Sequence, residues 1–129
     1  MLPFLIELKT GDSPFRQVVY AATRAIVSGE MSAGAAFPSV RELSQALKIN
    51  PNTAHKIVAE LVRETLLEVI TGVGTIVARP STDVTHAKRQ SLSAAIEALI
   101  IEARRTGATK SELNAMITDQ WKQLFGAKP

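Results

Sequence analysis

The fold is decided by residues 37–61, FPSVRELSQALKINPNTAHKIVAEL, which predict two helices joined by a short polar turn. Ser39 and Glu42 have the Ser-x-x-Glu spacing of a capping box, in which each side chain satisfies a backbone N–H at the helix start. The first helix therefore begins at Ser39. Its apolar residues recur at helical spacing and are expected to face a core; they are Val40, Leu43, Ala46 and Leu47.

A second helix starts immediately after the turn. Asn50 is a good N-cap, and Pro51 suits the first helical position, where its missing N–H costs nothing. The apolar face of this helix is formed by Ala54, Ile57, Val58 and Leu61. The residues left on its outer face include Asn52, His55, Lys56, Ala59 and Arg63. A short helix, a tight turn and a helix that offers polar groups in its first turns indicate a helix-turn-helix.

Length and composition limit the class of protein. At 129 residues the chain forms one compact domain, or a small domain with an appendage, since domains usually hold roughly 100 to 150 residues. No apolar run approaches the ~20 residues of a membrane span, and the run at 2–8 contains Glu7 and lacks the pattern of a signal peptide. The absence of cysteine excludes disulfides and argues against structural zinc. We therefore expect no metal, no cofactor, no membrane contact and a cytoplasmic location.

The net charge of +3 is a weak argument for nucleic-acid binding, because of where the charge lies. Residues 1–78 contain as many acidic as basic side chains, so the whole surplus follows residue 78. The case for DNA binding must therefore rest on which side chains face the groove.

Two further elements are expected before residue 37. In residues 4–9 every second side chain is large and apolar, which predicts a short edge strand before the turn at Gly11-Asp12. A helix then starts at Ser13-Pro14, with the serine as cap, and stops at Gly29. Residues 31–36 are expected to be a loop.

A β-hairpin is expected after the second helix of the pair. Residues 66–70 and 75–78 flank Thr71-Gly72-Val73-Gly74, with glycines where the turn needs positive φ. Three helices followed by a hairpin form a winged helix, in which the hairpin is the wing. The expected fold class is thus mainly α with a small β-hairpin wing, and residues 1–78 form a winged helix-turn-helix domain.

Residues 79–129 predict a helical tail beyond a break at Arg79-Pro80-Ser81. A helix of about 25 residues is followed by one of about 15 residues that starts at a capping box, Thr109 to Glu112. Their apolar faces are too wide to be buried against each other, so we expect the same two-helix hairpin from a second chain to cover them. The residues expected at this dimer interface are Leu92, Ile96, Leu99, Ile100, Leu113, Met116, Ile117, Trp121 and Leu124.

At these residues the sequence resembles the GntR family of bacterial transcription regulators. The matching segments lie in the right order and are Ser13-Pro14-Phe15-Arg16-Gln17, Ile26-Val27-Ser28-Gly29-Glu30, Phe37-Pro38-Ser39-Val40-Arg41-Glu42-Leu43, Asn52-Thr53, Glu60-Leu61, Leu66-Leu67-Glu68 and Gly72-Val73-Gly74-Thr75. The short helical tail and Asn50-Pro51-Asn52-Thr53 are similar to the YtrA-like branch. The large effector-binding or aminotransferase-like domains of other branches do not fit in residues 79–129.

The resemblance implies a DNA-reading surface. It implies that Arg41 reaches the DNA, that Asn52, Thr53 and His55 meet bases and phosphates, and that Gly72 at the wing tip approaches the minor groove. The chemistry agrees, because arginine can bridge guanine O6 and N7 and asparagine can pair with adenine N6 and N7. The residues expected to contact DNA are Ser39, Arg41, Asn50, Asn52, Thr53, His55, Lys56, Thr71 and Gly72.

The chain departs from the family pattern in three places. Pro51 stands where many members have an arginine, and the wing lacks their basic residues. We therefore expect base readout to depend on Arg41, Asn52 and His55, and wing contact to be weak. Thr65 replaces the usual glycine, so the turn there is expected to be strained or differently shaped.

The sequence thus predicts a homodimeric, sequence-specific transcriptional regulator, by expectation a repressor, that binds an inverted repeat in a double-stranded DNA operator. The alternative is a winged-helix protein-interaction module without specific DNA binding, which the neutral first 78 residues and the non-basic wing favour. An enzyme is not expected, since no nucleophile–base pairing is evident. An unidentified small-molecule effector would have to bind between helices or at the dimer interface.

Ordinary surface roles compete with several of these functional roles. Arg41 could be a solvated side chain paired with Glu42, and His55 and Lys56 could be solvated surface groups. The apolar residues of the tail could line a ligand pocket in place of a dimer interface.

Overall fold

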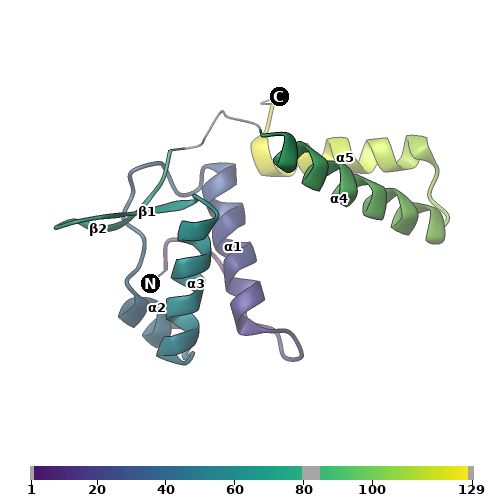
Figure 1. Cartoon of the computed structure of the whole chain (residues 1–129). Coiled ribbons are helices and arrows are strands. Elements are labelled where there is room, and N and C mark those ends of the chain that lie inside the picture. The colour runs from purple at the N-terminus through teal and green to yellow at the C-terminus, as the bar shows by residue number, and fades with distance from the viewer. Residues whose placement is uncertain (1, 80–84, 128–129) are drawn as a thin grey trace. The chain divides into compact units, whose positions relative to one another are not determined.

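Three helices and a two-stranded hairpin form the N-terminal unit, Met1–Pro80, of the computed structural model, which describes residues 2–79 and 85–127. The elements are α1 (Pro14–Ser28), α2 (Val40–Leu47), α3 (Pro51–Arg63), β1 (Leu67–Ile70) and β2 (Gly74–Val77). Helix α3 packs against α1, α2 and β1, and the hairpin projects away from the helices (Figure 1). The predicted winged helix-turn-helix is confirmed.

The predicted caps fix where α2 and α3 begin. The Ser39 hydroxyl oxygen accepts a hydrogen bond from the Glu42 N–H at 3.1 Å, and the Glu42 carboxylate accepts one from the Ser39 N–H at 3.3 Å. Asn50 Oδ1 accepts from the Asn52 N–H at 2.8 Å, and Pro51 occupies the first turn of α3. These bonds satisfy backbone donors that a helix start would otherwise leave free.

The hydrophobic core lies between the three helices and the base of the hairpin. Its fully buried side chains are Val18, Ala22, Leu43, Ala54, Ile57 and Leu61. Ala46, which the sequence placed in the core-facing stripe of α2, is exposed. Leu43 is the buried residue of α2, and Ala46 lies about 60° away from it around the helix. Because this short helix buries only a narrow face, Ala46 stays outside the core.

The edge strand predicted in residues 4–9 was wrong, although the predicted side-chain alternation was right. Phe4 is buried and stacks on Phe37, with ring centroids 6.0 Å apart. The backbone nearby is satisfied by a side chain: Gln17 Oε1 accepts from the Lys9 N–H at 2.8 Å, and Gln17 Nε2 donates to the Lys9 carbonyl at 3.0 Å. An amide side chain thus replaces the sheet partner that a strand would need.

The segment before α2, predicted as a loop, supplies the extra sheet contact instead. Ala36 forms an antiparallel bridge with Ile76, and the Phe37 N–H donates to the Thr75 carbonyl at 2.9 Å. On its other edge β2 pairs with β1 in the register Leu67↔Val77, Glu68↔Ile76, Val69↔Thr75 and Ile70↔Gly74. The base of the hairpin is therefore held from both sides.

The turn between α3 and β1 is strained, which is one of the two outcomes predicted from the missing glycine. Thr65 has a φ of 61°, in the left-handed region that a β-branched residue rarely adopts. Its N–H donates to the Val62 carbonyl at 2.9 Å, which closes the last turn of the helix.

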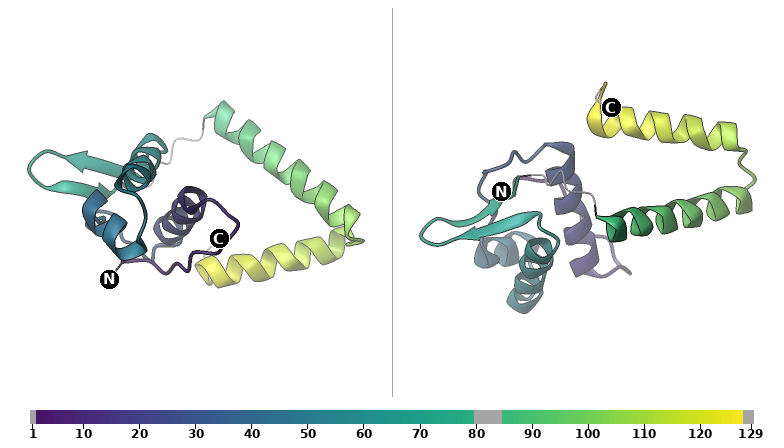
Figure 2. Two further views of the ribbon diagram at one scale, coloured as in Figure 1. Left: turned by 90° about the horizontal axis from the view of Figure 1, so that it is seen from below. Right: turned by 45° about the horizontal axis from the view of Figure 1, so that its top comes forward.

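Two helices make up the C-terminal unit, Ser81–Pro129: α4 (His86–Arg105) and α5 (Lys110–Phe125). Both helices extend to the same side of the turn that joins them, so the chain direction reverses between α4 and α5 (Figure 2). The predicted capping box is present, since Thr109 and Glu112 exchange two hydrogen bonds of 3.1 Å. Helix α4 has 20 residues, fewer than predicted. Within the described ranges, no helix is both long and apolar enough to cross a membrane. Most of the predicted break at Arg79-Pro80-Ser81 lies outside the described residues.

Candidate nucleic-acid interface

Two of the predicted site residues are helix caps, Ser39 at the start of α2 and Asn50 at the start of α3. Ser39 and Asn50 each use a side-chain oxygen to accept a backbone N–H, so those oxygens stabilise the helix starts. The Ser39 hydroxyl proton and the Asn50 amide NH2 are the groups left for DNA. Both residues are exposed. They are thus suited to donate to phosphate, which positions a protein without reading sequence.

Arg41 is exposed on the first turn of α2. The neighbouring carboxylate of Glu42 is engaged by the Ser39 N–H. The ion pairs found in the described part of the chain involve Arg63 and Arg105, so the pairing of Arg41 with Glu42 is not seen. Its guanidinium is available for the bidentate contact with guanine that its chemistry allows.

The outer face of α3 presents an amide, an imidazole and an ammonium group. Asn52, His55 and Lys56 are exposed on the side of the helix opposite the buried Ile57 and Leu61. Helix α3 is capped by Asn50, and its inner face is packed in the core. The position of the three exposed side chains is therefore fixed by the helix. This is the arrangement that a helix needs to enter the major groove.

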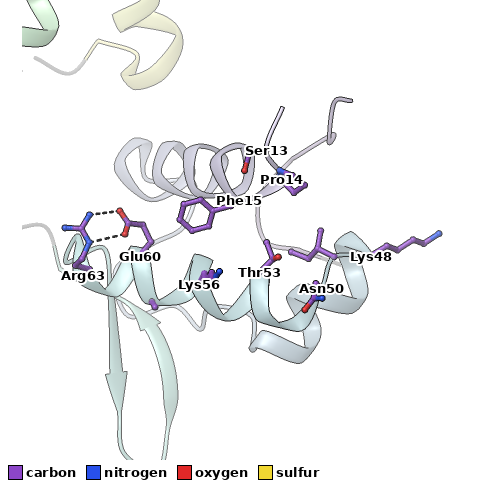
Figure 3. Close-up of a pocket in the computed structure, with 11 residues that line it drawn as sticks. Ser13, Pro14, Phe15, Lys48, Asn50, Thr53, Lys56, Glu60 and Arg63 are labelled. Atoms are coloured by element: carbon purple, nitrogen blue, oxygen red, sulfur yellow. Dashed lines mark hydrogen bonds and ion pairs between the residues drawn. The ribbon is translucent and has the colours of Figure 1, made fainter. Parts of the chain in front are cut away.

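Thr53 lies apart from that outer face, turned towards α1. It is half-buried and lines a groove of about 740 Å³ together with Lys56 and residues 13–15 at the start of α1 (Figure 3). Lys48, in the left-handed conformation at the end of α2, lies at the same groove. Thr53 therefore faces α1, whereas Asn52 and His55 lie on the outer face of α3 and Lys56 is exposed at the edge between that face and the groove. The start of α1 was not among the predicted site residues, although Ser13-Pro14 was predicted to start a helix and residues 13–17 resemble the family.

The positive charge of Arg63 is engaged in ion pairs and is not available to DNA. Its guanidinium pairs with the carboxylate of Glu60 at 2.6 Å (Figure 3). It also pairs with the carboxylate of Glu64 at 2.7 Å. Hydrogen bonding from Arg63 holds the pKa of Glu60 below its ordinary value, and the same contacts raise the pKa of Arg63. The positive charge near the start of α3 therefore comes from Arg41, Lys48 and Lys56.

The wing tip is built from a glycine turn without basic residues. Thr71 and Gly72 are exposed, and Gly72 has a φ of 82°, which a side chain would strain. The Val73 N–H donates to the Ile70 carbonyl at 3.0 Å and closes the turn. Val73 was not among the predicted site residues, although it is 73% exposed at the tip.

The C-terminal unit presents its predicted interface residues to solvent. None of its described side chains is buried, and large apolar residues along both helices are 44–62% exposed. The predicted residues in that exposed set are Leu92, Ile96, Leu99, Ile100, Met116, Ile117 and Trp121, whereas Leu113 and Leu124 are half-buried. Ile101 is 59% exposed and was not among the residues predicted at the dimer interface. An apolar cavity of about 360 Å³ remains between α4 and α5.

Comparison with known proteins agrees with this architecture. Residues 15–77 match the family described as bacterial regulatory proteins, gntR family. The chain is similar to the HTH-type transcriptional repressor YtrA of Bacillus subtilis, with 28% identity over 124 residues that cover 95% of each chain. It is also similar to the uncharacterized HTH-type transcriptional regulator YhcF of the same organism, with 31% identity over 68% of this chain and 73% of that one.

Among solved structures, a transcriptional antiterminator from Listeria monocytogenes has the same fold, with a TM-score of 0.82 and 22% identity over 98% of this chain and 95% of the other. The fold, the segments that match between residues 15 and 77 and the similarity across the tail lead to one assignment. The chain belongs to the GntR family of bacterial regulatory proteins, as a YtrA-like transcriptional regulator with a DNA-binding helix-turn-helix.

Proposed function

We propose that this regulator is a homodimeric repressor that binds an inverted-repeat operator, with α3 of each chain in the major groove. The observation that carries the proposal is the C-terminal unit, in which the described residues of α4 and α5 form no buried core. Two helices with exposed apolar faces are not stable alone in water, because helical stability in proteins comes mostly from the packing of such faces. A second copy would cover both.

A dimer also supplies what one recognition helix lacks. One α3 offers few base-reading groups, chiefly Asn52 and His55, with Arg41 from α2, and this N-terminal domain carries no overall positive charge. Two copies double the number of contacts and match a two-fold operator, whose half-sites lie about 10 bp apart or a multiple of that. Similarity to the YtrA repressor over 95% of both chains supports the repressor role.

The cavity between α4 and α5 lies within the proposed dimer interface. A small-molecule effector bound there would alter the packing of the two tails and thereby the spacing of the two recognition helices, which is how differential binding shifts a population of states.

The experiment combines sedimentation equilibrium with a gel shift on a duplex from the regulator's own upstream region. Wild-type protein should sediment as a dimer and shift the duplex as one complex of two chains. Ile100→Asp, which places a charge on the exposed face of α4, should give a monomer with at least about tenfold weaker DNA binding. Leu5→Asp is the matched control, because Leu5 is 93% exposed in the N-terminal unit. A wild-type monomer that binds its operator tightly would contradict the proposal.

A further inference from the structure

The wing exposes large apolar side chains and carries no basic residue. Glu68 is the one charged residue between Leu67 and Val77. Val69 and Val73 are 66% and 73% exposed, and the hairpin that carries them projects away from the helices (Figures 1 and 2). Such a wing gains nothing from phosphate charge. Beyond the Thr71 hydroxyl and the backbone at Gly72, its contacts with DNA would come from shape and apolar side chains.

The base of the hairpin is fixed relative to α3. Leu67 and Val77 are each 2% exposed and form the first pair of the hairpin. The Val77 N–H donates to the Ala35 carbonyl at 2.9 Å, and the Gly34 N–H donates to the Val77 carbonyl at 2.8 Å. The direction of the wing is thus set by the core that also positions α3.

The reach of the wing matches the distance between neighbouring grooves. The tip at Gly72 is five residues beyond the buried Leu67, which spans about 17 Å of extended chain. One turn of B-DNA is about 34 Å, so the centres of adjacent major and minor grooves are about 17 Å apart along the axis. With α3 in the major groove, the wing tip would lie at the adjacent minor groove.

We infer that Val73 acts there as a specificity-determining residue that selects A·T over G·C pairs in the minor groove under the wing. The inference rests on the proposed DNA binding. In the minor groove an A·T pair shows only acceptors, whereas a G·C pair adds the N2 amino group of guanine as a donor. A valine side chain cannot accept that hydrogen bond, and covering the amino group removes its water. Apolar side chains in the minor groove are an established means of DNA contact.

The geometry of the turn singles out Val73. Gly72, with no side chain and a φ of 82°, lets the backbone approach the groove, and Val73 is the apolar side chain next to it. The Val73 N–H is already used by the Ile70 carbonyl, so the residue offers the groove its two methyl groups. Val69 lies on the same face as the buried Leu67, further from the tip.

The test uses an operator obtained by selecting bound duplexes from random sequence. Pairs about half a turn from the α3 contacts are changed from A·T to G·C, or to inosine·C, which lacks the N2 amino group. The wild-type Kd should rise about five- to tenfold with G·C and stay unchanged with inosine·C. Val73→Thr keeps the shape of the side chain and adds an acceptor, so its G·C penalty should fall below about twofold, with the same salt dependence.

Val27→Thr is the control, because Val27 is an exposed valine of α1. It should keep the wild-type response. Equal binding of wild type to A·T and G·C flanks on a specifically bound operator would overturn the inference and leave the proposed function standing. Equal penalties for G·C and inosine·C, or an equal response of Val27→Thr and Val73→Thr, would also overturn it. The absence of any specifically bound duplex would overturn the proposed function and the inference together.

Discussion

Replacing Arg41 with alanine should weaken specific DNA binding and leave the fold intact. The side chain is exposed and lies outside the ion pairs of the described residues. The capping box at the start of α2 is made by Ser39 and Glu42 and does not use it. Since alanine is the best helix former, the free energy of unfolding should change by no more than about 0.5 kcal/mol.

The expected loss of binding free energy is estimated from the contact between Arg41 and guanine, which the proposed dimer makes once per chain. A bidentate contact between arginine and guanine contributes about 1 to 3 kcal/mol of discrimination. The proposed dimer carries two copies of Arg41, so the binding free energy should fall by about 2 to 6 kcal/mol if the two sites act independently. The lower bound corresponds to an increase of about 30-fold in Kd.

Fluorescence anisotropy on a labelled operator, with a scrambled duplex as competitor, measures this loss at fixed salt. Arg24→Ala is the matched control, because it removes the same charge from an exposed position of α1. Its effect should stay below about threefold, since exposed charges are screened by salt. Urea denaturation of both variants checks that the fold is unchanged.

Two results would refute the role given to Arg41. Wild-type affinity in the Arg41→Ala variant would remove the residue from the interface. An equal loss of affinity for operator and scrambled duplex would show that it contacts phosphate and does not read a base.

Three further predictions concern stability. Thr65→Gly should raise the free energy of unfolding by about 1 kcal/mol in a urea titration, because it relieves the strained φ of 61°; a destabilised variant would contradict the strain. Phe4→Ala should cost about 3 to 5 kcal/mol in the same titration, because it empties a buried site against Phe37; a loss under about 1 kcal/mol would show that the N-terminal segment is not part of the core. The folded pKa of Glu60 is below its ordinary 4.5, so the stabilisation by Arg63 is present above that value and is lost as the pH falls through the folded pKa. Thermal unfolding of Glu60→Gln should therefore depend less on acid pH than that of wild type, and identical profiles would contradict this.

Much of the N-terminal fold could be predicted because its helix starts are encoded locally. Ser39 and Glu42, and Asn50 with Pro51, specify where α2 and α3 begin without help from the rest of the chain. The positive φ at Thr65 was also predictable, since the turn geometry is required whichever residue stands there.

The sheet partner could not be predicted, because pairing depends on residues distant in sequence. The alternation in residues 4–9 predicted a strand there, whereas residues 31–36 were predicted as a loop. The structure gives the sheet edge to Ala36, while the Gln17 side chain satisfies the backbone at Lys9. Nothing in the local pattern of residues 4–9 indicates that an amide on α1 would take that role.

Only part of the candidate site could be predicted, because some of its side chains depend on elements distant in sequence. Helical spacing placed Asn52 and His55 on the outer face of α3, as observed. It could not show that Thr53 turns towards α1, or that Arg63 is paired with Glu60, because these depend on neighbouring elements and rotamers.

The central claim is that two copies of this chain read a two-fold symmetric site. Selection of bound duplexes from random DNA by the full chain tests it most directly, because one experiment reports specificity, symmetry and half-site spacing. We predict enrichment of an inverted repeat with half-sites centred about 10 bp apart, or a multiple of that distance. Enrichment of a single asymmetric half-site, or no enrichment at all, would contradict the claim.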